Sequence, residues 1–473
     1  MALEGPVVLT AAVVAAATGG TALSEGGKVF GRFSIDSRTL QPGDAFIALK
    51  GERFDGAAYA EAVLGGGASG VVINRAAGLG ASLAARWPGA AIVEVDDTLT
   101  GLQRLGHYVR RESGARVVAI TGSAGKTTTK ELAATFLAAQ YRVFRNAGNL
   151  NNHVGLPLSL LELVARPDMA VVELGMNHHG EIRHLVSIAE PDVRVWTNVG
   201  DAHLGHFESA DDLATAKAEI LEGADPSSLV VANRDDTRVM RHIEAFTGRV
   251  ATFGFSEQAD VRAADVEDAG TLGTRARVET RAGSVDVQVP LVGLGNLLNV
   301  LAATAVALEY DVPLKAVAET VRSVRAAKHR GEVVRLRDGI TLVDDSYNSS
   351  PSALGRALDA IARDRGHRRR VAVLGEMLEL GEFSTALHQQ CGRTAAAAGV
   401  DVLVAVGGPP AAQLAAAARA AGLGKGSVHY VTTSEEAADL VAKTVAAGDL
   451  VLVKGSRGIK TDVVATRVIA EWS

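Results

Sequence analysis

Apolar and polar positions along this chain follow two patterns, short apolar runs and longer stretches with helical spacing. The run 117–120 is typical of the first pattern, because three of its four residues (Val117, Val118 and Ile120) are β-branched and a Gly-rich turn follows it. The stretch 98–113 is typical of the second, with Leu99, Leu102, Leu105 and Val109 at helical spacing. Buried strands that alternate with such helices predict an α/β protein with mostly parallel sheets.

The pattern divides the chain into three regions. Residues 1–98 alternate short helical and strand patterns between turn signals. In the second region, 99–330, strand–helix units run throughout from Arg116 to about 330, which predicts a mostly parallel sheet with helices on both faces. Residues 331–473 hold four or five further apolar strands between Ala-rich helices, which predicts a Rossmann-like domain without the G-x-G-x-x-G fingerprint. A chain of 473 residues exceeds what one hydrophobic core serves, so we expect two or three domains.

Composition and charge narrow the classes of protein. The net charge of −6 gives no general basic footprint and disfavours nucleic acid as a partner. One cysteine, Cys391, excludes an intramolecular disulfide framework, and its Ala-rich surroundings favour a packed residue over a nucleophile. The apolar run 7–18 follows no Lys or Arg and is too short to span a bilayer, so we expect a helix ending at Gly19–Gly20, no membrane insertion and a cytoplasmic protein.

The strongest candidate chemistry lies at TGSAGKTTTKE, residues 121–131, which follows the strand 117–120 directly. A strand, a Gly-rich turn and a helix N-terminus together bind phosphate, because backbone N–H groups and the helix dipole converge on the anion. Lys126 would reach the β- and γ-phosphates and Thr127 would ligate Mg²⁺. Ile120 stands where the phosphate-loop motif has its first Gly, so an ordinary Gly-rich turn with an exposed Lys is the alternative.

Polar residues gather where the predicted strands end, and ligands bind there in open α/β sheets. Glu173 follows Val171–Val172 and is placed to hold Mg²⁺, with a salt-bridged strand-end Glu as the alternative. His203 is equally compatible with a second metal and with a core or capping role, and His178, His179 and His206 individually fit loop histidines. The other strand-end and loop residues of this group are Asn146, Asn149, Asn151, Asn152, Asn177, Asn198 and Asp201.

Three further positions are ambiguous on pattern alone. Lys217, between two alanines of a predicted helix, fits a solvated charge, and the Asp36-Ser37-Arg38 cluster fits a solvated loop. Lys454 and Arg457 stand in a Gly/Ser turn that suits either an anion site or plain exposed basic residues.

Nine motifs occur in an order that resembles the Mur ligase family: TGSAGKTTTKE, NLNNHVGLP, ELGMNHHGEI, NVGDAH, ATAKAEI, GNLLN, DDSYNSSP, LGEMLELG and VKGSRG. The resemblance runs from about residue 36 to about residue 455, and the family's loop has the same TGxxGKTT form. ELGMN and DDSYN resemble the branch that joins D-alanyl-D-alanine to UDP-N-acetylmuramoyl-tripeptide (UDP-MurNAc-tripeptide).

The resemblance implies a UDP-sugar-binding domain at 1–98, an ATP-binding domain at 99–330 and a Rossmann-like domain at 331–473. It implies an amide ligase that uses ATP and two Mg²⁺ ions, works through an acyl phosphate on small-molecule substrates, and acts as a monomer. By resemblance, the ATP contacts are Gly122, Ser123, Ala124, Gly125, Lys126, Thr127, Thr128, Asn299 (adenine), Arg330 (γ-phosphate) and Asp345 (ribose). The metal ligands are Thr127, Glu173, His203 and a carbamylated Lys217, and the substrate contacts are Ser37, Arg38, Asn151, Asn152, Asn177, His178 and Lys454.

Two departures from the family pattern stand out. Gly295 replaces a usual His near the adenine, and Ser350 replaces an Asn but should keep the N-cap of the next helix, with Pro351 at its first position. Two alternative functions remain open: another amide ligase, of the muramyl-tripeptide or folylpolyglutamate synthetase type, and a non-catalytic ATP-binding regulator. The absence of a DNP motif disfavours the diaminopimelate-adding branch, and retention of Lys126, Glu173, His203, Lys217 and Arg330 disfavours the regulator.

Overall fold

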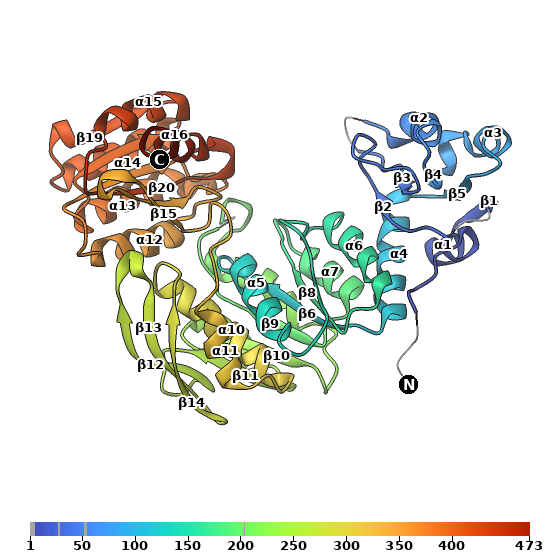
Figure 1. The fold of residues 1–473 in the computed structure, drawn as a ribbon, viewed down its shortest axis with the longest axis horizontal. Coiled ribbons are helices and arrows are strands. Elements are labelled where there is room, and N and C mark those ends of the chain that lie inside the picture. The colour runs from blue at the N-terminus through green and yellow to red at the C-terminus, as the bar shows by residue number, and fades with distance from the viewer. Residues whose placement is uncertain (1–4, 27–28, 52–53, 203) are drawn as a thin grey trace. The chain divides into compact units, whose positions relative to one another are not determined.

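A computed structural model describes residues 5–26, 29–51, 54–202 and 204–473 of the chain (Figure 1). Its strands form three sheets, of five, nine and six strands. The chain folds into two compact units. The first holds the residues up to Ile120 together with Gln140–Arg194 and Glu222–Ser228, and the second holds Thr121–Ala139, Val195–Leu221 and Leu229–Ser473.

The five-stranded N-terminal sheet is parallel except at one edge. Its order is β1 (Thr21–Ser24), β5 (Ala91–Val95), β4 (Gly70–Asn74), β3 (Ala45–Ile47) and β2 (Phe33–Ser34), and only β1 runs antiparallel to its neighbour. Helices α1 (Ala11–Thr18), α2 (Ala60–Gly65) and α3 (Gly80–Arg86) belong to the same region. The predicted helix end is confirmed, since Gly19 has a φ of +72° and follows the last residue of α1.

Helix α4 (Thr98–Ser113) follows this sheet with the predicted bounds. Asp97 caps its start by accepting from the Thr100 N–H at 2.7 Å, and Gly114 ends it in the left-handed conformation. On the predicted apolar face, Leu102, Leu105 and Val109 are inaccessible to solvent, and Leu99 is half-buried. α4 packs against α6 (Gly155–Leu160) and α7 (Glu181–Ala189), which follow strands of the central sheet.

The central sheet has nine strands. In order they are β14 (Gly283–Val289), β13 (Thr274–Thr280), β12 (Val261–Asp268), β11 (Arg249–Gly254), β10 (Leu229–Asn233), β9 (Val193–Trp196), β6 (Arg116–Thr121), β8 (Met169–Glu173) and β7 (Val143–Arg145). Its helices include α5 (Lys126–Leu137), α8 (Ala210–Ala218), α9 (Thr237–Ile243), α10 (Leu294–Glu309) and α11 (Leu314–Val321). α10 packs against α5, so it supports the helix that begins at the Gly-rich turn.

The prediction of strand–helix units throughout from Arg116 to about 330 is wrong at one edge of this sheet. Strands β12, β13 and β14 pair antiparallel, and β13 and β14 form a hairpin closed by the pair Thr280 and Gly283. β13 buries every second residue at its start, a pattern that suits a sheet covered on one face. The alternation in TRARVET was the sequence signal for this hairpin.

The C-terminal sheet confirms the Rossmann-like prediction. Its order is β15 (Glu332–Arg335), β16 (Thr341–Asp345), β20 (Asp449–Lys454), β17 (Arg369–Gly375), β18 (Val402–Val406) and β19 (Val428–Val431). All neighbours pair parallel except β15 with β16. Residues of α12 (Pro351–Arg363), α13 (Ser384–Ala397) and α14 (Pro409–Ala420) share one apolar cluster with the sheet, and α15 (Ser434–Thr444) and α16 (Asp462–Trp472) share another.

Two smaller predictions can be checked in this region. Cys391 is buried in the first of these clusters, and burial raises the pKa of its thiol to about 12, so it is a packed residue. Ser350 occupies the N-cap position of α12 with Pro351 next, but its side chain makes no capping hydrogen bond, so that part of the prediction is wrong. Within the described residues, no helix is both long and apolar enough to cross a bilayer.

Candidate active site

The Gly-rich turn between β6 and α5 has the backbone of a phosphate loop. β6 ends at Thr121 and α5 begins at Lys126, as predicted. Gly122 and Gly125 have φ values of +142° and +86°, which side chains with a Cβ rarely adopt. Gly125 directly precedes the helix, and a Cβ added to Gly125 would contact the Asn299 side chain. The turn therefore needs both glycines for its shape.

Residues that follow β9 hold this turn in place. The Asn198 backbone carbonyl accepts from the Ser123 N–H at 3.0 Å. The Asn198 side-chain amide both accepts from the Ala124 N–H and donates to the Ala124 carbonyl, each at 3.0 Å. Thr197 Oγ1 donates to the same carbonyl at 2.7 Å. Each of these bonds fixes loop backbone, and the strand-end Asn198 predicted from sequence is one of the loop's supports.

Lys126 and Lys217 are the two lysines of this region. Lys126 Nζ donates to the Gly122 carbonyl at 2.7 Å, so its ammonium lies over the loop. Lys217, on α8, is 2% exposed, and the expectation of a solvated charge is wrong. Burial lowers the pKa of Lys217 well below its ordinary value, and the positive charge of Lys126 lowers it further. The two side chains therefore belong to one electrostatic site.

Glu173 is a buried carboxylate held by two asparagines in the first unit. It is 3% exposed, and its Oε1 accepts from Asn151 Nδ2 at 2.8 Å. Its backbone N–H donates to Asn146 Oδ1 at 3.2 Å. The two amides contribute to this orientation, and a salt-bridged strand-end Glu stays the alternative. The Asn-rich stretch noted in the sequence thus includes two residues that position Glu173.

Four of the candidate substrate residues, Asn151, Asn152, Asn177 and His178, lie on two connected loops of this unit. The Gly175 N–H donates to the Asn151 carbonyl at 2.8 Å and joins the loops. Asn152 Oδ1 accepts from the Gly155 N–H at 2.8 Å and so fixes the start of α6. Asn177 is exposed, its N–H donates to Glu181 Oε2 at 2.8 Å, and the neighbouring His178 is exposed as well.

Asn299 lies beneath the phosphate loop on α10. It is 8% exposed; its Oδ1 accepts from Thr129 Oγ1 at 3.2 Å, and its Nδ2 donates to Asn296 Oδ1 at 3.1 Å. The amide thus links α10 to α5, and its predicted contact with adenine stays a prediction. At Gly295, a Cβ would lie 3.4 Å from the Arg356 side chain, so Arg356 borders the space of the missing His.

The C-terminal candidates surround the end of β16. Lys454 is 3% exposed, and its Nζ contacts Asp345 Oδ2 at 2.6 Å and donates to the Asn348 carbonyl at 3.0 Å. The guanidinium of Arg330 lies 3.8 Å from the centre of the Tyr347 ring, a cation–π contact. Sequence reasoning missed Tyr347, although an aromatic residue inside DDSYN was its signal.

Two further predicted positions complete the comparison. Arg38 forms a two-pronged ion pair with Asp36 at 2.8 and 2.9 Å, and these bonds lower the pKa of Asp36 to about 2, while Ser37 lies between them in the same turn. His203 lies outside the described residues, so its metal role stays a prediction. Among the residues that the structure describes, no three His, Cys, Asp or Glu side chains form a ready metal cluster.

Family comparisons match nearly the whole chain. The model described as "Mur ligase family, catalytic domain" matches residues 32–107, "Mur ligase middle domain" matches 120–307, and "Mur ligase, glutamate ligase domain" matches 329–457. The UDP-N-acetylmuramoyl-tripeptide--D-alanyl-D-alanine ligase of Bacillus subtilis is 32% identical, with 92% of each chain covered. The enzyme of that name from Escherichia coli is 35% identical, with 90% of each chain covered.

Solved structures agree with these relatives. MurF from Acinetobacter baumannii is similar with a TM-score of 0.86 and 31% identity, covering 98% of this chain and 99% of that one. A second Acinetobacter baumannii structure, named as a UDP-N-acetylmuramoylalanyl-D-glutamyl-2,6-diaminopimelate--D-alanyl-D-alanyl ligase, gives a TM-score of 0.83 at 30% identity with the same coverage. MurF from Thermotoga maritima in complex with ADP gives a TM-score of 0.80 at 29% identity. The similarity covers 93% of this chain and 97% of that one. With its sheets, its phosphate loop and these relatives in agreement, the chain belongs to the Mur ligase family.

Proposed function

We propose that this protein is the ATP-dependent ligase that joins D-alanyl-D-alanine to UDP-MurNAc-tripeptide, giving the UDP-MurNAc-pentapeptide used in peptidoglycan synthesis. The observation that carries the proposal is the pairing of a phosphate loop held by Asn198 with the buried Lys217, on which the charge of Lys126 acts. The relatives from Bacillus subtilis and Escherichia coli are named for this reaction, and the similarity covers about nine-tenths of each of them. No observation favours another amide ligase or a non-catalytic regulator.

The phosphate loop fits ATP. Its backbone N–H groups and the start of α5 offer donors and partial positive charge to the triphosphate, and Gly122 and Gly125 allow close approach. Lys126 adds a full positive charge, and the Thr127 hydroxyl sits at the start of α5, where a Mg²⁺ ligand is needed. We assign the ATP phosphates to Gly122, Ser123, Ala124, Gly125, Lys126, Thr127 and Thr128.

Lys217 fits a modified metal ligand better than it fits a charged lysine. A buried ammonium is unfavourable, and the lowered pKa favours the uncharged amine, which is the form that reacts with CO₂. The amine nitrogen bonds the CO₂ carbon and releases one proton to solvent, and the product, a carbamate, is an anionic oxygen ligand that suits Mg²⁺. We propose two Mg²⁺ ions, held by Thr127, Glu173, His203 and carbamylated Lys217, which would neutralise charge on the phosphates.

The reaction is difficult because two anions must meet. The tripeptide carboxylate attacks the γ-phosphate of ATP, ADP leaves, and the resulting acyl phosphate is attacked by the amine of D-alanyl-D-alanine, which loses a proton as phosphate departs. We propose that Lys126 and Arg330 stabilise the charge on the transferring phosphoryl group. Exclusion of water by the C-terminal domain would protect the acyl phosphate from hydrolysis.

The remaining assignments concern substrate binding. We propose that Asn299 faces adenine, Asp345 the ribose, and Ser37 and Arg38 the uridine end of the nucleotide sugar. Asn151, Asn152, Asn177, His178 and Lys454 would contact the peptide substrates. We further propose that the protein works as a monomer in the cytoplasm, with domain boundaries near residues 98 and 330.

The test is ADP release by the purified protein with Mg-ATP, adding UDP-MurNAc-tripeptide and D-alanyl-D-alanine singly and together. We expect rapid turnover only with both, and a pentapeptide product. Turnover with a different amine would assign the protein to another branch, and no turnover with any pair despite ATP binding would overturn the enzyme assignment.

A further inference from the structure

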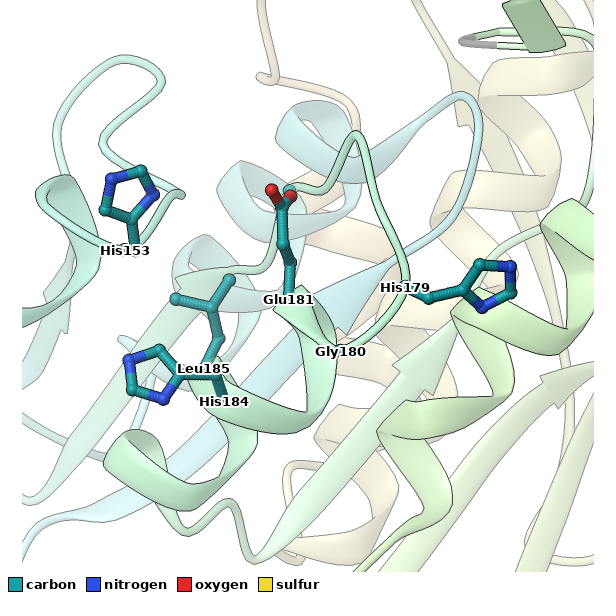
Figure 2. Close-up of a pocket in the computed structure, with 7 residues that line it drawn as sticks. His153, His179, Gly180, Glu181, His184 and Leu185 are labelled. Carbon is teal, nitrogen blue, oxygen red and sulfur yellow. The ribbon is translucent and has the colours of Figure 1, made fainter. Parts of the chain in front are cut away.

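A small cavity lies at the start of α7, wholly within the first unit (Figure 2). It has a volume of about 230 Å³ and is lined by His153, Gly175, His179, Glu181, His184 and Leu185 among others. Pockets for whole small ligands measure roughly 300–1,000 Å³, so this cavity suits one end group of a larger substrate. A water molecule takes about 30 Å³ of liquid volume, so the space exceeds what one or two waters would fill.

The cavity offers donors for an anion and an acceptor for a cation. Figure 2 shows the rings of His153 and His184 on one side, with Leu185 and the Glu181 carboxylate next to them, while the His179 ring turns to the other side. Imidazole N–H groups donate to carboxylates, and a carboxylate accepts from ammonium groups. Glu181 Oε2 already accepts from the Asn177 N–H at 2.8 Å, which fixes the side chain and leaves further lone pairs for a ligand.

The cavity adjoins the Glu173–Asn151 pair. Gly175 follows Glu173 by two residues, and His153 follows Asn151 by two residues. The Gly175 N–H donates to the Asn151 carbonyl, and Asn151 Nδ2 donates to Glu173 Oε1, both at 2.8 Å. A substrate that places its reacting carboxylate near Glu173 would therefore have its side chain within reach of the cavity.

Resting on the proposed function, we infer that the cavity binds the distal amino-acid group of a diaminopimelate residue at the third position of the tripeptide. Glu181 accepts from the ammonium, His153 and His184 donate to the carboxylate, and Leu185 contacts the methylene chain. The name of one relative contains diaminopimelate, which is the same class of substrate. A lysine in that position has the ammonium but not the carboxylate, so it would leave both imidazoles without a ligand partner.

The test compares two substrates, UDP-MurNAc-tripeptides that end in diaminopimelate or in lysine. We expect the wild type to favour the diaminopimelate substrate through a lower KM. His153→Gln and His184→Gln should each raise that KM about tenfold and leave the KM for the lysine substrate unchanged, with kcat altered less than about twofold. Glu181→Gln, whose amide oxygen can still accept from the Asn177 N–H, should raise the KM for both substrates.

The matched control is His429→Gln on β19, outside the cavity, which should change neither KM. Calorimetric binding of each nucleotide-peptide without ATP gives a second readout that does not depend on catalysis. Equal affinity of the wild type for the two substrates, or equal losses for both in His153→Gln and His184→Gln, would overturn the inference while leaving the ligase function intact. Absence of turnover with unchanged binding discrimination would instead contradict the proposed function alone.

Discussion

The ammonium of Lys126 lies close enough to Lys217 for its charge to lower the pKa of that buried amine, in addition to the larger effect of burial. Two neighbouring lysines would repel each other if both were charged, and the exposed fraction of Lys217 is only 2%. The arrangement is therefore unfavourable for a charged Lys217 and favourable for an uncharged or anionic one. Lys126, by contrast, keeps a hydrogen bond to the phosphate loop.

The first prediction follows from this pair. An uncharged amine reacts with CO₂, so ligase activity should depend on bicarbonate. Protein depleted of CO₂ at pH 7 should lose most of its ADP-releasing activity and regain it when bicarbonate is added. Lys217→Gln should be inactive with and without bicarbonate, whereas the exposed Lys315→Gln should behave like the wild type. Full activity of CO₂-depleted wild-type protein would contradict the carbamate assignment.

The second prediction concerns stability and pH. Between the lowered folded pKa of Lys217 and the unfolded value of about 10.4, the unfolded state binds one more proton at this site than the folded state. The contribution of Lys217 to the free energy of unfolding therefore rises with pH between these two pKa values, by up to about 1.4 kcal/mol per pH unit. Lys217→Met should remove this slope. The measurement is urea unfolding of bicarbonate-free wild type and Lys217→Met at several pH values from 7 to 9. If the free energy of unfolding changed with pH in parallel for the two proteins, the prediction would be wrong.

The third prediction concerns Gly125 of the phosphate loop and distinguishes the steric effect of a Cβ from the strain of a positive φ. At Gly125, φ is +86° and a Cβ would contact Asn299, whereas at Gly448 φ is +80° and nothing lies within 4 Å of a Cβ. Both alanine variants should lose about 1 kcal/mol of stability from the positive φ. Only Gly125→Ala should also weaken ATP binding, by about tenfold or more, in a calorimetric titration. Equal ATP affinity of the two variants would show that the loop tolerates the side chain.

Sequence patterns predicted the parts of this fold that local chemistry determines. Helix α4 has the predicted bounds because Asp97, a regular apolar face and Gly114 all agree, and α5 begins at Lys126 because a Gly-rich turn can end only there. The hairpin of β13 and β14 was missed because its alternation was interpreted within a strand–helix series.

Long-range burial accounts for the failures at the site. Lys217 sits on a short Ala-rich helix whose sequence suggests exposure, and only the packing around it shows otherwise. His153 and His184 are 31 positions apart in the sequence and share one cavity only because the turn before α6 and helix α7 both line it. No spacing rule relates such residues, so the structure was needed to bring them together.

The fourth prediction concerns Tyr347 as a positioning residue for Arg330. A cation–π contact at 3.8 Å, worth about 0.5–2 kcal/mol, restricts where the guanidinium can lie. Tyr347→Phe should keep kcat within about twofold, because it keeps the ring, and Tyr347→Leu should lower kcat about fivefold or more. In an Arg330→Ala background the Tyr347→Leu change should have no further effect on kcat. Additive losses would show that Tyr347 acts independently of Arg330.

The last prediction concerns Glu173 and its amide support. Because Asn151 Nδ2 already donates to Oε1, a Gln at position 173 can keep that hydrogen bond through its own oxygen while losing the negative charge. Glu173→Gln should therefore fold normally and bind ATP without Mg²⁺ as the wild type does. Its half-saturating Mg²⁺ concentration for ligase activity should rise about tenfold, since a carboxylate is the stronger ligand for this ion.

The control for this variant is Glu162→Gln, an exposed carboxylate of the same unit that should leave the Mg²⁺ dependence unchanged. Asn151→Ala gives the complementary test, because it frees Glu173 from its amide partner without removing the charge. Its Mg²⁺ requirement should rise less than that of Glu173→Gln, since the ligand remains but its orientation is lost. An unchanged Mg²⁺ requirement in Glu173→Gln would assign this buried carboxylate a purely structural role, and the metal ligands would then have to lie elsewhere.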